Sequence, residues 1–115
     1  MTKLYGISSC GSCKLATKWL TDKGIDYDFV DVRTEGVDES VIERWQEALG
    51  WEALVNKRSI TWRKIPQFDR AELDAGKVRD LIINYPTVMK RPVLDTGDAV
   101  LLGFDKYAYN ELGLA

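Results

Sequence analysis

The chain has 115 residues, of which 45% are hydrophobic, and this length and composition are typical of one folded domain with a buried core. It carries 16 Lys and Arg against 18 Asp and Glu, and the resulting net charge of -2 argues against an electrostatic binder of nucleic acid. No apolar run approaches the ~20 residues that a membrane span needs, and the start lacks a signal-peptide stretch, so we expect a cytoplasmic protein.

The first elements along the chain predict a β-α-β unit. Residues 3–7 are a short β-prone run, and residues 11–24 have a helical pattern that Gly24 ends. The expected apolar face of this helix consists of Leu15, Ala16, Trp19 and Leu20. Residues 26–32 alternate in the manner of a strand, and a strand-helix-strand unit of this size favours parallel strands.

The middle of the chain, residues 37–85, looks wholly helical. We expect a first helix capped by Asp38 or by Ser40, with Glu43 completing a capping box on Ser40, and ended by Gly50. Its expected apolar face consists of Val41, Ile42, Trp45, Ala48 and Leu49. The basic stretch that follows, residues 55–65, is either a loop or a short helix.

A second helical stretch is expected to open with a capping box of Asp69 and Glu72. Gly76 is expected to break it into two short helices, and Pro86 to stop it. The apolar face predicted for it consists of Val78, Leu81, Ile82 and Tyr85.

The end of the chain returns to strands. Residues 93–95 and 99–102 flank Thr96 and Gly97 as a hairpin, and a last helix follows with Asp105 as its cap. The order βαβ…ββα predicts an α/β fold, with a four-stranded mixed sheet and helices against it. We expect residues 1–115 to be a single domain with residues 37–85 inserted in it; another small α/β fold is the alternative.

The chemistry of the chain is limited by its lack of histidine. That absence excludes Ser-His-Asp and Cys-His catalytic groups and imidazole metal ligands. The two cysteines, Cys10 and Cys13, cannot fill a four-ligand zinc site within one chain, so we expect no metal. Any nucleophile must then be activated by backbone dipoles, lysine or arginine.

The segment "SSCGSCKLA" places Cys10 at the junction of a strand and a helix, where free N–H groups and the helix dipole favour a thiolate. Gly11 and Ser12 leave the sulfur uncrowded, and Lys14 adds positive charge. Cys13 lies one helical turn on, within reach of Cys10, and can close a disulfide with it. The alternative is that both cysteines are merely small buried hydrophobic residues.

Two further stretches carry candidate binding residues. In "KRPV", Pro92 opens a strand, and in thioredoxin-like folds such a proline is cis and packs beside the active thiol. Arg91 would then lie near Cys10 and could bind a carboxylate or oxyanion, although read alone it is a solvated charge. The basic segment "NKRS", residues 56–59, is either a solvated loop or a second binding element.

Taken together, "LYGISSCGSCKLATKWL", "LGWEALVNKRSITWRK" and "YPTVMKRPVL…LLGF" resemble the arsenate reductase (ArsC)/Spx family, and YffB-like members in particular. The resemblance implies a thioredoxin-like fold with a helical insertion. It also implies that Cys10 is the catalytic nucleophile, that Cys13 is a candidate resolving cysteine, and that Arg91 and Arg58 bind substrate. Gly11, Ser12, Lys14 and Pro92 complete the expected site.

The sequence departs from that family pattern at two places, which favour a substrate other than arsenate. Gly103 stands where arsenate reductases carry a third arginine, and Gly6 lies near the place of a histidine. We therefore expect a thiol-dependent reductase that has no bound cofactor and uses glutathione as co-substrate. Its expected partners are glutathione, glutaredoxin or thioredoxin and a small thiol or oxyanion substrate, and we expect a monomer.

The alternative function is a redox-sensing transcription regulator. Spx regulators carry a CxxC switch and bind the α subunit of RNA polymerase, and Cys10 and Cys13 match that switch. An inert thioredoxin-like scaffold is a third interpretation, and it predicts an ordinary pKa, near ~8.5, for Cys10.

Overall fold

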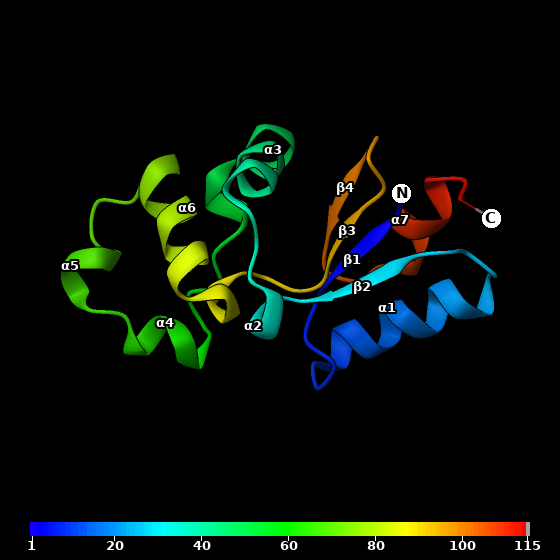
Figure 1. Ribbon diagram of the computed structural model, residues 1–115, viewed down its shortest axis with the longest axis horizontal. Coiled ribbons are helices and arrows are strands. Elements are labelled where there is room, and N and C mark those ends of the chain that lie inside the picture. The colour runs from blue at the N-terminus through cyan, green and yellow to red at the C-terminus, as the bar shows by residue number, and fades with distance from the viewer. Residues whose placement is uncertain (115) are drawn as a thin grey trace. The chain divides into compact units, whose positions relative to one another are not determined.

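The computed structural model describes residues 1–114, and these divide into two compact units (Figure 1). The sheet unit combines residues 1–32 with the chain from Arg91 onward, and the helical unit comprises residues 33–90. The helical unit thus contains the whole stretch 37–85 that the sequence predicts to be helical. Within residues 1–114, no helix is both long enough and apolar enough to cross a membrane.

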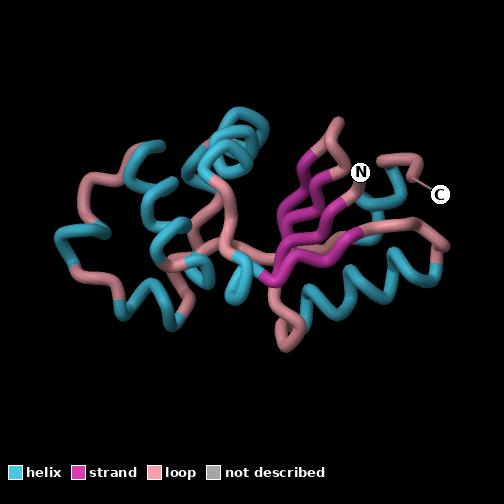
Figure 2. The backbone as a smooth tube through the Cα atoms, viewed as in Figure 1, coloured by secondary structure: helices cyan, strands magenta, loops and turns pink. Residues whose placement is uncertain are grey.

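The sheet unit has the predicted order of strands and helices. Its elements are β1 (Lys3–Gly6), α1 (Gly11–Asp22), β2 (Asp28–Asp31), β3 (Val93–Asp95), β4 (Val100–Leu102) and α7 (Lys106–Glu111). The strands form one sheet in the order β2-β1-β3-β4, with β1 parallel to β2 and the other neighbours antiparallel. This is the four-stranded mixed sheet that the sequence predicts, and Figure 2 shows these strands in magenta.

One row of side chains across the sheet forms the core with α1 and α7. Phe29, Leu4, Leu94 and Leu101 are register partners on successive strands, so they lie on the same face. Leu4 and Leu94 are fully buried in one cluster with residues of both helices, Ala16, Leu20 and Tyr109. The two helices therefore cover the same face of the sheet and hold β1 and β3 side by side.

The apolar face of α1 differs from the predicted one. Leu15 was expected to pack inward, but it is 56% exposed, and this expectation is wrong. The buried residues are Cys13, Ala16 and Leu20, at spacings of three and four. Cys13 thus belongs to the core-facing stripe of the helix.

The helical unit is built of short helices. They are α2 (Val32–Glu35), α3 (Glu39–Leu49), η1 (Trp51–Ala53), α4 (Ile60–Lys64), α5 (Gln67–Arg70), α6 (Ala75–Asn84) and η2 (Pro86–Val88). Helix α3 packs against α6, and Ile42, Trp45, Val78 and Ile82 are fully buried. A single antiparallel bridge between Val55 and Met89 ties the loop after η1 to the end of the unit.

The predicted helix starts in this unit need correction. Asp38 is the N-cap position of α3 but makes no side-chain cap bond, and Ser40 lies inside the helix, so the predicted capping box is wrong. Ala48, expected on the apolar face, is exposed. The basic stretch does contain a short helix, α4, whose cap Ser59 accepts a hydrogen bond from the N–H of Trp62 at 3.1 Å.

The second predicted capping box is also wrong. Helix α5 ends at Arg70, and Glu72 has a φ of 52°, in the left-handed region, so it cannot continue a helix. Asp74 is the real cap of α6, because its carboxylate accepts a hydrogen bond from the N–H of Lys77 at 2.8 Å. Gly76 lies within the first turn of α6 and does not break the helix.

Candidate active site

Cys10 occupies the N-cap position of α1. Strand β1 ends at Gly6, and the turn that follows is closed by a hydrogen bond from the N–H of Cys10 to the carbonyl of Ile7 at 3.1 Å. The backbone of Cys10 is extended, and its carbonyl already accepts the first helical bond from Lys14 at 3.0 Å. The Cys10 side chain therefore stands at the positive end of a 12-residue helix, as the sequence predicts.

The surroundings of Cys10 favour its thiolate. Partial burial raises the pKa of Cys10, but four groups lower it: the N–H and thiol of Cys13, the guanidinium of Arg91 and the N–H of Ser12. Their combined effect exceeds that of burial, so the pKa lies below the ordinary value for a thiol. A depressed pKa makes Cys10 a better nucleophile near neutral pH.

The surroundings of Cys13 favour its protonated thiol instead. It is 1% exposed, and both cysteines are free thiols. Burial, with a smaller contribution from Cys10, raises the pKa of Cys13 to about 11 against the opposing effects of the Ile7 N–H and Arg91. At neutral pH the pair therefore consists of a reactive sulfur and a protonated neighbour that can hydrogen bond to it.

Gly6 makes room for the Cys13 sulfur. A Cβ at position 6 would lie 2.4 Å from Cys13 Sγ, closer than real Cβ contacts allow. Gly6 is the last residue of β1, so the strand end and the first turn of α1 touch through this thiol. Sequence reasoning noted Gly6 only as a departure from a family pattern and missed this contact. A glycine closing a strand just before a CxxC is the signal that could have indicated it.

Arg91 and Pro92 directly precede strand β3. The Arg91–Pro92 peptide bond is cis, which confirms the expectation for this proline. Pro92 is buried next to β3, and its carbonyl accepts a hydrogen bond from the N–H of Gly103 at 2.8 Å. Since β3 pairs directly with β1, this arrangement brings Arg91 to the Cys10 sulfur, where it lowers the pKa.

The remaining predicted site residues are placed as follows. Gly11 and Ser12 are exposed at the start of α1, and a Cβ on Gly11 would meet no atom within 4 Å apart from its chain neighbours and the backbone of its own helix. Lys14 is also exposed, and it lines a small pocket of about 190 Å³ beside Cys13. The other lining residues of that pocket are Ser8, Thr17, Tyr27 and Phe29.

Arg58 belongs to the helical unit and not to the sheet unit that carries Cys10. Its N–H donates a hydrogen bond to the side-chain oxygen of Asn56 at 3.0 Å, which forms a tight turn. It lines a basic hollow together with Lys57 and Lys90. Arg58 is thus one of several exposed cations in this unit.

The chemistry available to the sheet unit is thiol chemistry. Within residues 1–114, no three His, Cys, Asp or Glu side chains gather as metal ligands would. Gly103, where a third arginine was noted as missing, has a φ of 75°, a conformation that an arginine adopts only with strain. A low-pKa thiol, a protonated partner thiol and one guanidinium can attack an oxidised sulfur and hold a carboxylate beside it.

Comparison with known proteins gives a family match over most of the chain. The ArsC family model matches residues 5–112. An uncharacterised protein of Haemophilus influenzae is 35% identical over 95% of this chain and 96% of its own length. The global transcriptional regulator Spx 2 of Bacillus anthracis is 29% identical over 91% of this chain and 81% of its own length.

Solved structures of related proteins have a similar fold. The YFFB protein superposes with a TM-score of 0.92 at 36% identity, and each chain is covered completely. An arsenate reductase (ArsC) related protein from Brucella melitensis has a TM-score of 0.71 at 37% identity, over 96% of this chain and 92% of the other. A glutaredoxin from Archaeoglobus fulgidus, 19% identical with a TM-score of 0.54 over 99% and 86% of the two chains, shares the thioredoxin-like fold.

Proposed function

Because the chain belongs to the ArsC family, we propose that it is a thiol-dependent reductase in which Cys10 is the nucleophile. The observation that carries this proposal is the position of Cys10 at the N-cap of a 12-residue helix, one turn before the buried thiol of Cys13 and beside the Arg91 guanidinium. Cys10 reacts as a thiolate, and Cys13 stays protonated until the second step. Arg91 binds an anionic group next to the reacting sulfur.

In the first step, the Cys10 thiolate attacks one sulfur of a disulfide that contains glutathione. A bond forms between Cys10 Sγ and the glutathione sulfur, the original S–S bond breaks, and the other sulfur leaves as a thiolate that takes up a proton from water. Arg91 binds a glutathione carboxylate. The N–H groups of residues 11 to 13 stabilise the negative charge during the attack.

In the second step, Cys13 resolves the mixed disulfide. The Cys13 thiol gives its proton to the leaving glutathione sulfur while its Sγ bonds to Cys10 Sγ, so glutathione leaves reduced and a Cys10–Cys13 disulfide remains. Two thiols of glutathione, or one glutaredoxin or thioredoxin, supply the two electrons that reopen this disulfide. With glycine at position 103, the site has few cations for a small trianion, which favours an oxidised thiol over arsenate.

The test is the pH dependence of Cys10 alkylation, followed by mass spectrometry with and without oxidised glutathione. As the pH is raised, we expect the alkylation rate of Cys10 to reach its plateau at a lower pH than that of a free thiol. In the presence of oxidised glutathione, we expect a glutathione adduct to form on Cys10. The Cys13→Ser variant should accumulate that adduct, whereas the unmodified chain should release it. A rate that keeps falling below pH 8, or an adduct equally stable in both proteins, would contradict the proposal.

A second function is favoured by one observation, the similarity to Spx regulators. In that case, the CxxC pair would act as a sensor that changes binding to the α subunit of RNA polymerase on oxidation. Pull-down of purified α subunit by the reduced and the oxidised chain distinguishes the two functions. Redox-dependent binding together with no glutathione-linked turnover favours the regulator, and turnover that Cys10→Ser abolishes, without binding, favours the reductase.

A further inference from the structure

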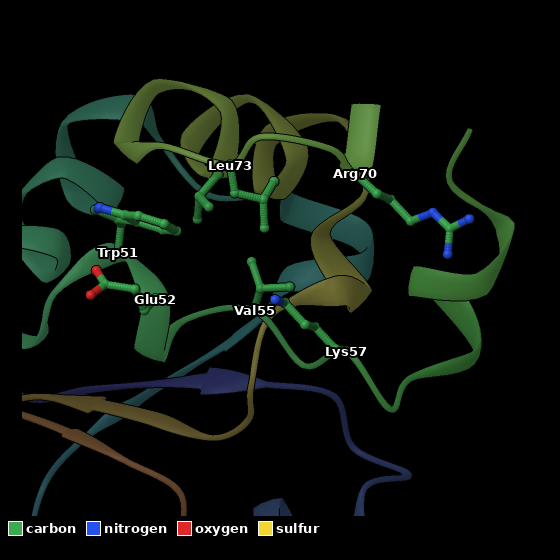
Figure 3. Close-up of a pocket in the computed structure, with 7 residues that line it drawn as sticks. Trp51, Glu52, Val55, Lys57, Arg70 and Leu73 are labelled. Atoms are coloured by element: carbon green, nitrogen blue, oxygen red, sulfur yellow. The ribbon is translucent and has the colours of Figure 1, made fainter. Parts of the chain in front are cut away.

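The helical unit contains a pocket of about 290 Å³ that takes no part in the thiol site. Its walls are apolar on one side, formed by Trp51, Val55, Leu73 and Val78. Figure 3 shows the Trp51 ring directed into the space between Leu73 and Val55, with the nitrogen of Lys57 beside Val55 and Arg70 at the edge. This size lies at the lower end of ligand pockets, which run from ~300 Å³, so it fits one ring and a short chain.

Two cations at this pocket are held without a counter-ion. The Lys57 ammonium lies 5.8 Å and the Arg70 guanidinium carbon 5.6 Å from the centroid of the same ring, that of Trp62. Neither cation forms an ion pair with any of residues 1–114, although Glu52 lines the same pocket. Because neither cation has a carboxylate partner in the chain, both are available to an anion bound in the pocket.

Arg70 lines the pocket with a charged side chain. A guanidinium donates two parallel hydrogen bonds to a carboxylate, which makes a carboxylate the anion that suits it best. The two cations occur at an apolar pocket, so a ligand that fits both features carries a negative charge and an apolar body.

We propose that this pocket binds a small organic carboxylate with an aromatic or branched apolar body. The carboxylate sits at Arg70 and Lys57, and the apolar body packs on Trp51 between Val55 and Leu73. The carboxylate of Glu52 in the same wall disfavours ions with two or more negative charges, such as phosphate. The proposal does not depend on the reductase activity, because none of these residues belongs to the Cys10 site.

The test uses 3-phenylpropionate as the probe and the full chain, titrated by calorimetry and by NMR of the indole and methyl signals. We expect saturable binding with shifts centred on Trp51, Val55 and Leu73. The neutral analogue 3-phenylpropanol should bind about tenfold or more weakly, because a hydrogen bond to a charged group contributes ~1.5–3 kcal/mol. Acetate and inorganic phosphate should bind more weakly than 3-phenylpropionate. This series of ligands is measured on the unmodified chain, so its result does not depend on whether a variant folds.

Variants then locate the site. Lys57→Gln and Arg70→Gln should each weaken binding about tenfold, while Arg63→Gln, an exposed cation on α4 that does not line the pocket, should leave it unchanged. Cys10→Ser should also bind normally, which separates this site from the proposed reductase. Absence of saturable binding, phosphate binding at least as tight as 3-phenylpropionate, or an equal loss in Arg63→Gln would overturn the proposal.

Discussion

Replacing Gly6 by alanine tests the contact that joins β1 to the CxxC helix. The new Cβ would lie 2.4 Å from Cys13 Sγ, about 1 Å short of the 3.4 Å at which ordinary contact begins. Cys13 is 1% exposed, so the sulfur has no solvent space to move into without shifting the first turn of α1. Overpacking of this kind costs ~1–3 kcal/mol, and we expect Gly6→Ala to lower the free energy of unfolding by that amount.

The assay is urea unfolding of the reduced protein, and a double variant isolates the cause. Cys13→Ala removes the sulfur, and the remaining contact of 3.4 Å to the Cβ of residue 13 is tolerable. Gly6→Ala should therefore cost much less in the Cys13→Ala background than in the unmodified chain. Gly11→Ala is the matched control, because its Cβ meets nothing within 4 Å, and it should cause no loss of stability.

Two results would refute this reasoning. One is a Gly6→Ala variant as stable as the unmodified chain, which would mean that the sulfur moves away at no cost. The other is an equal loss in the presence and absence of the Cys13 sulfur, which would mean that the strand end itself rejects a side chain. Alkylation of Cys10 should continue in Gly6→Ala, whereas closure of the Cys10–Cys13 disulfide should slow, because the second sulfur is displaced.

Three more predictions follow from the same geometry. Arg91→Gln should raise the pKa of Cys10 toward that of a free thiol, so its alkylation at pH 7 should slow several-fold, and an unchanged pH profile would contradict the assigned contact. Burial holds the pKa of Cys13 at about 11, above the unfolded value of 9.0, so the folded state keeps a proton that the unfolded chain loses. Unfolding measured in a Cys10→Ser background should show stability lost as the pH rises from 9 to 11, and Cys13→Ala should reduce that loss. Asp74→Ala should cost ~1 kcal/mol of unfolding free energy through loss of the α6 cap, while Asp69→Ala should change it little.

Elements with strong local signals could be read from the sequence. The order of strands and helices in the sheet unit follows from alternation and from helical spacing, which neighbouring residues decide. The sequence narrowed the start of α3 to Asp38 or Ser40, of which Asp38 is the N-cap position, and it misplaced the start of α6, because Asp69 and Asp74 are equally good caps in sequence. Which of them is used depends on where the chain turns, and the left-handed Glu72 that decides the start of α6 carries no local signature.

The reactive residues and the different roles of the two sulfurs could be predicted, but the contacts that set them apart could not. Two cysteines at this spacing, at a strand-helix junction and without histidine, already indicate a thiol couple at a helix N-terminus. That Cys13 is the buried, protonated member depends on Gly6, and Arg91 reaches Cys10 because β3 pairs with β1.

The sequence by itself therefore determined that a helix starts directly after Cys10 and that its first turn carries two cysteines, since both depend on neighbours along the chain. Only the tertiary structure showed that Cys13 is buried against Gly6 and that the Arg91 guanidinium acts on the Cys10 sulfur. Burial and charge act through space, and the residues responsible come together only when the sheet forms.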